Sequence, residues 1–160
     1  MDHLDIDNIL ETYSDMVYRI AYTQMKSQTD AEDVYQEVFL RLVKNYKKIK
    51  SEAHLKHWLI RVTINCCYSQ LGSSWNKHKA RYEDNQSVLE PSIKRDEELD
   101  DLLEACHGLN EKDRMIIHLH YFEGYALQEI ADFLEMSLDA TKKRLSRARQ
   151  TLKKEIGGDY

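Results

Sequence analysis

The segment from Gly124 to Leu152 constrains the fold more than any other, because it contains two amphipathic helical patterns separated by a short break. Apolar residues recur in each pattern at steps of three and four, the spacing that places side chains on one face of an α-helix. Ser137, just before the second pattern, is of a type that caps helix N-termini. Two short helices packed across a tight turn form a helix-turn-helix, whose second helix enters the major groove of DNA. The apolar residues are Leu127, Ile130, Ala131 and Leu134 in the first pattern and Leu138, Thr141, Leu145, Ala148 and Leu152 in the second.

The opposite side of the second pattern is strongly basic. Arg and Lys side chains bind phosphates and form specific contacts with guanine, so this side is the predicted surface for duplex DNA. A basic face that meets only solvent is the alternative, but the Glu-Ile-Ala-x-x-Leu stretch in the first pattern favours the helix-turn-helix. The predicted DNA-binding residues are Lys142, Lys143, Arg144, Ser146, Arg147 and Arg149.

Helical periodicity also runs through the rest of the 160 residues, which include one proline and five glycines, and it predicts an all-α protein. Helices are expected at about 7–25, 29–46 and 55–71, the second beginning with a capping box of Thr29 and Glu32. The buried side of the third is expected to include Trp58, Leu59, Val62 and Cys66.

The helical pattern fades between Gly72 and Arg95, where glycine, serine, proline and acidic residues are typical of a loop. It resumes at about Asp96, and Asn110 is expected to cap a further helix. The sequence therefore predicts two small helical domains joined by a flexible linker. Their predicted bounds are 1–76 and 96–160, with the linker at 77–95.

The net charge of −5 is distributed unevenly along the chain. Residues 38–82 carry ten basic side chains and one acidic side chain, whereas 1–37 carry nine acidic and two basic ones. Residues 83–113 carry eleven acidic and three basic ones. Basic patches separated by acidic blocks predict a protein that binds nucleic acid with some surfaces and other partners with the rest.

The second predicted helix carries a polar stripe beside its apolar stripe. Glu37 and Arg41 are four residues apart and can form an ion pair worth a few tenths of a kcal/mol. Alone, such a stripe would be interpreted as an ordinary solvated face. Its residues are Asp33, Gln36, Glu37 and Arg41.

The third predicted helix and the segment before it interleave basic and aromatic residues. Basic groups follow a phosphate backbone and aromatic rings stack on unpaired bases, so this region could bind single-stranded nucleic acid. The alternative for Trp58 is a place in the core. The candidates from the residue pattern are Lys50, His54, Lys56, Trp58 and Arg61.

Other classes of function have little support. The three cysteines, Cys66, Cys67 and Cys106, form no C-x-x-C pair, and the histidines lack the spacing of a metal site, so no metal or cofactor is expected. There is no glycine-rich phosphate loop and no nucleophile elbow, so an enzyme is not expected. The chain has no apolar run of transmembrane length and an acidic N-terminus, which predict a cytoplasmic protein.

These features together resemble the extracytoplasmic-function (ECF) sigma factors, the compact sigma-70-type initiation factors of bacterial RNA polymerase. The resemblance covers nearly the whole chain and rests on several stretches in the right order. They are Asp-Ala-Glu-Asp-Val-Tyr-Gln-Glu-Val-Phe at 30–39, Trp-Leu-Ile-Arg-Val-Thr-Ile-Asn at 58–65, Leu-Asn-Glu-Lys-Asp-Arg at 109–114, Glu-Gly at 123–124, Glu-Ile-Ala at 129–131 and Arg-Leu-Ser-Arg-Ala-Arg at 144–149.

The resemblance implies a role for each surface. The polar stripe at 33–41 would bind the β′ clamp helices of core polymerase, and the C-terminal domain would meet the β flap. The segment 49–56 would hold a base flipped out of the −10 element, with Asn65 as a further base contact. Lys142, Lys143 and Arg147 would reach bases of the −35 element, with Arg144 and Arg149 nearer to phosphates. An anti-sigma factor is an expected partner.

The chain departs from the family pattern at three places in the helix-turn-helix. Ala126 stands at a usual Ser/Thr cap, Glu135 at the usual turn glycine, and Asp139 at a usual glycine of the second helix. The alternative function is a one-component transcriptional regulator with a helix-turn-helix and a helical sensor domain, which would typically dimerise on a palindrome.

Overall fold

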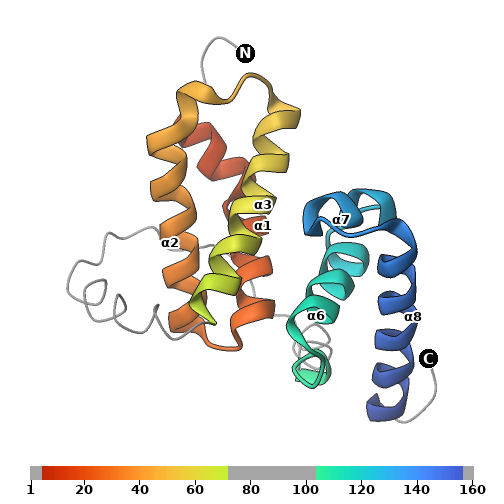
Figure 1. Cartoon of the computed structure of the whole chain (residues 1–160). Helices are drawn as coiled ribbons and strands as arrows, with labels where there is room; N and C mark the ends of the chain where they lie inside the picture. Colours follow the sequence, from red (N-terminus) through yellow and green to blue (C-terminus); the bar gives the residue numbers. More distant parts are fainter. Residues whose placement is uncertain (1–4, 72–103, 157–160) are drawn as a thin grey trace. The chain divides into compact units, whose positions relative to one another are not determined.

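The computed structural model describes residues 5–71 and 104–156, and every regular element within these ranges is a helix (Figure 1). The predicted all-α class is therefore confirmed. The chain divides into two compact units, Met1–Ile93 and Lys94–Tyr160, each with its own core. The predicted linker at 77–95 lies outside the described residues.

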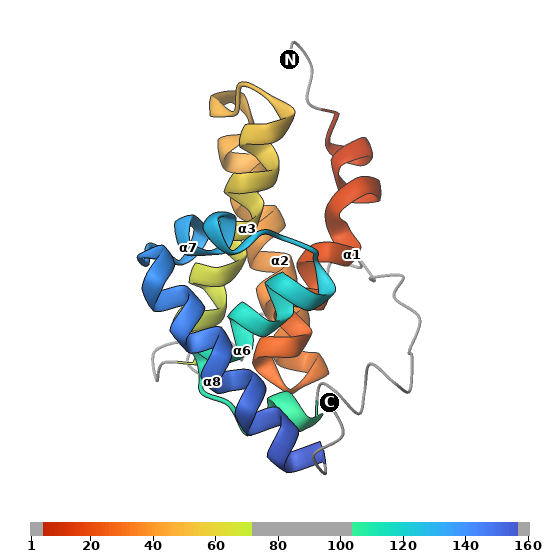
Figure 2. The same ribbon diagram turned by 90° about the vertical axis from the view of Figure 1, so that its right-hand side faces the viewer.

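The N-terminal unit is built from three helices, α1 (Ile6–Met25), α2 (Gln28–Asn45) and α3 (Glu52–Gln70). Each packs against the other two, and Figures 1 and 2 show α2 and α3 running along each other. A 3₁₀ turn, η1 (Tyr46–Lys48), follows α2. The core contains the fully buried side chains of Val17, Ile20, Val38, Leu42, Leu55, Leu59 and Ile60.

Two helix starts in this unit differ from the sequence prediction. Ser27 rather than Thr29 caps α2, because Ser27 has extended backbone and its Oγ accepts a hydrogen bond from the Asp30 N–H at 3.3 Å. Ser51 caps α3 in the same way, accepting from the His54 N–H at 3.1 Å. Helix α3 therefore begins at Glu52, so His54 lies in its first turn and not in the predicted loop.

The C-terminal unit contains α6 (Glu111–Ile117), α7 (Leu127–Leu134) and α8 (Leu138–Ile156). Asn110 caps α6 as predicted, accepting from the Asp113 N–H at 2.9 Å. Helix α8 packs against both α6 and α7. Its predicted inner face is largely confirmed. Thr141, Leu145, Ala148 and Leu152 are buried, together with Ile130 and Ala131 of α7, whereas Leu127, Leu134 and Leu138 are partly exposed.

A π-helical turn, η2 (His118–Phe122), joins α6 to the helix-turn-helix and was not anticipated from the sequence. A buried pair closes this turn, with His118 Nε2 and Glu123 Oε2 2.8 Å apart. Gly124 then adopts a φ of 76°, which glycine reaches without steric cost. This corner redirects the chain into α7.

The turn between α7 and α8 is a Schellman motif centred on Glu135, whose backbone is left-handed at φ 55° and ψ 46°. The Met136 N–H donates to the Ala131 carbonyl at 2.9 Å, and the Glu135 N–H donates to the Asp132 carbonyl at 3.3 Å. Ser137 caps α8 as predicted, accepting from the Ala140 N–H at 3.1 Å.

Ala126 occupies the N-cap position of α7 and has no side-chain acceptor with which to cap it. The reciprocal half of a capping box is present, because Glu129 Oε1 accepts from the Ala126 N–H at 3.2 Å. The departure from the family pattern at this position is therefore partly compensated by a neighbouring side chain.

Candidate nucleic-acid interface

The outer face of α8 presents the cations predicted from the sequence. Lys142, Lys143, Arg147 and Arg149 are exposed, as is Ser146, while the intervening Leu145 and Ala148 are buried against the rest of the unit. The alternation follows from the helical repeat, which turns every third or fourth residue inwards. Five of the six predicted residues are therefore accessible side chains on one helix.

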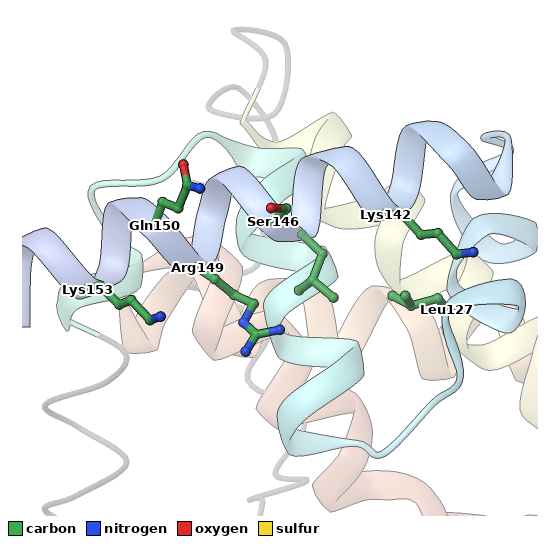
Figure 3. A pocket seen from close by; sticks show the side chains of 7 residues that line it. Leu127, Lys142, Ser146, Arg149, Gln150 and Lys153 are labelled. Atoms are coloured by element: carbon green, nitrogen blue, oxygen red, sulfur yellow. The ribbon is translucent and has the colours of Figure 1, made fainter. Parts of the chain in front are cut away.

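A hollow of about 340 Å³ runs along one flank of α8 (Figure 3). Figure 3 shows Lys142, Arg149 and Lys153 on the same side of α8 as Leu127, which belongs to α7. Among the residues that the structure describes, no acidic side chain contributes to the lining, so the hollow suits an anion such as a phosphate that lies beside an apolar floor. The lining residues are Leu127, Lys142, Leu145, Ser146, Arg149, Gln150 and Lys153.

Arg144 differs from the other predicted DNA contacts of α8. Its Nη1 donates a hydrogen bond to Asp113 Oδ1 of α6 at 3.0 Å, and its side chain is 30% exposed. Residues follow one another at about 100° around a helix, so Arg144 lies nearly opposite Lys142 and away from the hollow. The guanidinium thus already has a carboxylate partner inside the unit.

On α3, four of the predicted −10 residues share one stripe. His54, Trp58, Arg61 and Asn65 follow one another at steps of four, three and four within the helix, which is the spacing of a single face. His54 and Asn65 are exposed, whereas Trp58 and Arg61 are partly exposed. Trp58 was expected on the buried side and is instead at its margin, because the core of α3 is formed by Leu55, Leu59, Ile60, Thr63, Ile64, Cys66 and Cys67.

The segment before α3 is held in place by three local contacts. Ile49 is buried, and its N–H donates to the Tyr46 carbonyl at 3.2 Å. The Lys50 N–H donates to Nδ1 of His54 at 3.4 Å. Lys50 and Lys56 are exposed. The predicted base-holding segment is thus short and closely attached to the helix.

The polar stripe of α2 forms as predicted, with differences in exposure. Arg41 Nε donates to Glu37 Oε1 at 2.9 Å, which confirms the expected ion pair. Gln36 and Glu37 are partly exposed, but Asp33 is only 8% exposed. Its carboxylate therefore offers a partner little surface.

Two exposed apolar residues of α2, beside the polar stripe, were not identified from the sequence. Leu40 and Val43 are 47% and 50% exposed, large fractions for such side chains. They lie four and seven residues after Gln36, so the three share one face of the helix. The spacing of Leu40 and Val43 from Gln36 was the feature of the sequence that could have identified them. This face thus combines apolar and polar groups, as protein-binding surfaces commonly do.

The cysteines are buried and free. Burial raises the pKa of Cys66 to about 11 and that of Cys106 to about 11, so both are thiols at neutral pH. Within 5–71 and 104–156 no group of three or more potential metal ligands gathers. Over the same ranges, no helix has the length and apolar content to cross a membrane.

Both units are similar to known proteins. The sequence matches the family models for sigma-70 region 2 at residues 9–77 and sigma-70 region 4 at 99–152. The chain is 26% identical to RNA polymerase sigma factor SigV of Bacillus subtilis, over 87% of this chain and 83% of that protein. It is 32% identical to ECF RNA polymerase sigma factor SigE of Mycolicibacterium smegmatis, over 92% of this chain and 60% of that protein.

A solved structure shares the fold. It is the sigma factor RpoE in complex with the anti-sigma factor NepR from Bartonella quintana, with a TM-score of 0.76 at 21% identity, covering 96% of this chain and 98% of that chain.

Proposed function

The chain belongs to the sigma-70 family as an ECF-type RNA polymerase sigma factor, and from this premise we propose how its surfaces divide the work of promoter recognition. A factor of this type directs core polymerase to −35/−10 promoters and assists promoter opening; it initiates transcription rather than catalysing a reaction. The observation that carries this function is that regions 2 and 4 both match, in order, on two separate helical units. A one-component regulator is not favoured.

The outer face of α2 is the proposed docking surface for core polymerase, through the β′ clamp helices. Gln36, Glu37 and Arg41 would supply polar contacts, and the exposed Leu40 and Val43 would supply apolar area. Asp33 would take part mainly through its neighbours, because its side chain is buried. The hydrophobic effect favours covering the two apolar side chains, which are otherwise in contact with water.

The exposed stripe of α3 is the proposed surface for the single-stranded −10 element. Asn65 and His54 can form hydrogen bonds with bases, and the partly exposed Trp58 can offer a ring for stacking. Lys50, Lys56 and Arg61 would attract the phosphate backbone. The attachment of the preceding segment to α3 supports this role, since a pre-ordered surface loses less entropy on binding.

Helix α8 is the proposed recognition helix for the −35 element. Lys143 and Arg147 lie opposite the buried face and would meet base edges, with Lys142 beside them. Ser146 and Arg149, in the hollow, would bind phosphates with Lys142. The C-terminal unit would also contact the β flap.

An anti-sigma factor is the proposed regulatory partner. The support is that the RpoE structure of the same fold contains one. A cytoplasmic location is proposed because core polymerase and promoter DNA are both found there.

The test is reconstitution of transcription from defined components. Purified full-length chain is added to bacterial core polymerase, and transcripts are mapped on DNA libraries with varied −35 and −10 sequences. Start sites that depend on the chain and share two sequence blocks are expected. Failure to bind core, or a footprint on a palindrome without polymerase, would exclude the proposed function.

A further inference from the structure

We propose that Arg144 is a positioning residue: it fixes the recognition helix α8 on α6 through Asp113 and does not itself contact DNA. This inference rests on the proposed binding of the −35 element by α8, and it concerns which of the helix's cations meet the DNA. It separates Arg144 from the five other residues that the sequence grouped with it.

The ion pair joins two elements that are far apart in the chain. Arg144 Nη1 and Asp113 Oδ1 are 3.0 Å apart, with side chains 30% and 15% exposed. An ion pair that is largely shielded from water is weakened less by solvent than one on the open surface. It can therefore contribute to holding α8 against α6.

The acceptor is itself fixed. The backbone N–H of Asp113 donates to Oδ1 of the α6 cap, Asn110, at 2.9 Å, so Asp113 lies in the first turn of a capped helix. Neither end of the Asp113–Arg144 pair is on a loop. A rotation of α8 about its axis would have to break the hydrogen bond between Arg144 and Asp113.

The other cations of α8 are in a different situation. In the part of the chain that the structure describes, the charged groups of Lys142, Lys143, Arg147 and Arg149 carry no ion pair and are exposed. They can meet phosphates or bases without giving up an existing contact. Arg144 would have to leave a carboxylate that is mostly out of water, and an uncompensated buried charge is costly.

Holding the helix matters because recognition depends on placement. Side chains that recognise base edges must be held within about 0.5 Å of their productive positions by residues that are themselves ordered. Arg147 is three residues from Arg144, less than one turn away, so a contact that stops α8 from rotating also sets the direction of Arg147.

The two possible roles of Arg144 predict opposite changes in promoter affinity for Asp113→Asn. If the pair positions α8, the variant removes the negative charge and leaves only a neutral acceptor for Arg144, so −35 binding weakens by about three- to tenfold, as expected for coupled neighbours. If Arg144 is a DNA contact held back by Asp113, the same variant frees a cation, removes a nearby anion and tightens binding. Binding is measured with the full-length chain assembled with core polymerase on a −35/−10 promoter fragment.

Salt dependence provides a second readout. Arg144→Gln should weaken binding as much as Asp113→Asn while leaving the slope of log affinity against log salt unchanged. Loss of a true phosphate contact would lower the slope by about 0.9. Arg149→Gln is the matched comparison, since Arg149 is proposed to bind phosphate and its loss should lower the slope.

The charge swap Asp113→Arg with Arg144→Asp keeps the inference testable if a single variant is poorly folded. Recovery of affinity towards the original value supports the positioning role. Tighter binding by Asp113→Asn, a lower salt slope for Arg144→Gln, or failure of the folded swap to recover affinity would each overturn it. If the original protein with core shows no promoter affinity, the proposed function fails first and the inference falls with it.

Discussion

The left-handed residue in the helix-turn-helix predicts that Glu135→Gly will stabilise the C-terminal unit. Glu135 has φ 55° and ψ 46°, a conformation that an L-residue with a Cβ adopts at a cost of about 1–2 kcal/mol. Glycine adopts it without that cost but loses about 0.5–1 kcal/mol more backbone entropy on folding. The expected net gain in the free energy of unfolding is about 0.5–1 kcal/mol.

Two variants isolate the cause of the effect. Glu135→Ala removes the same carboxylate but keeps the Cβ, so any contact made by the carboxylate is lost equally in both variants. Their difference therefore reports the backbone strain, and Glu135→Gly should exceed Glu135→Ala by about 1 kcal/mol. Lys26→Gly tests the same geometry in the N-terminal unit, because Lys26 has a φ of 63° after α1.

The assay is thermal unfolding of the full-length chain followed by far-ultraviolet circular dichroism. A gain of 1 kcal/mol raises the midpoint of a domain of this size by about 4–8 °C. Glu135→Gly and Lys26→Gly should move the transitions of different units. If Glu135→Gly and Glu135→Ala unfold at the same temperature, the backbone at this turn is not strained and the reasoning is wrong.

Three further predictions follow from the proposed surfaces and the buried thiols. Arg147→Ala should weaken holoenzyme binding to a −35 promoter by about 1–3 kcal/mol if it contacts guanine. Lys112→Ala, which removes an exposed charge from α6, is the control. Equal promoter affinities of the two variants would argue against the base contact. Leu40→Asp should weaken binding to core polymerase by at least about 1 kcal/mol, since Leu40 is 47% exposed and burying a whole leucine side chain contributes about 1.5–3 kcal/mol. Leu71→Asp is the control, because Leu71 is 42% exposed but lies beyond the end of α3, and it should leave this binding unchanged. Equal losses of affinity for the two variants would contradict a specific surface on α2. Burial raises the pKa of Cys66 from 9.0 to about 11, so its contribution to the free energy of unfolding should be complete below pH 9 and be lost as the pH rises towards 11. Chemical unfolding at pH 8 and 10.5 should show a smaller loss of stability for Cys66→Ala than for the original chain, and parallel losses would refute this.

The sequence predicted the helices and several caps because those signals are local. Asn110 and Ser137 each stand at a sharp change of pattern, and the Glu37–Arg41 pair needs only the helical repeat to form. The start of α2 was misplaced because Ser27 and Thr29 are both good caps two residues apart. Only the backbone conformation distinguishes them.

The features that the sequence did not predict depend on contacts between distant segments or on exposure. The partner of Arg144 is 31 residues away in the chain, and no periodicity indicates such a pairing. The exposure of Leu40 and Val43 depends on which side of α2 the other two helices cover. The π-helical turn contains one member of a buried pair, His118 and Glu123, that composition alone does not indicate.

The uneven charge of the chain bears on how two small surfaces could select a promoter. Repulsion between fixed charges falls off over about 8 Å in physiological salt, so each basic surface acts on nearby DNA largely independently of acidic segments elsewhere. Beyond that distance the net charge of −5 supplies no general attraction towards DNA. Under the proposed function, affinity would come from α3 and α8 binding one promoter at the same time, and linked sites gain most when their separation matches the spacing of their targets. Core polymerase would fix that separation, and we therefore expect a factor with a modest basic face on each unit to select a promoter only as part of the holoenzyme.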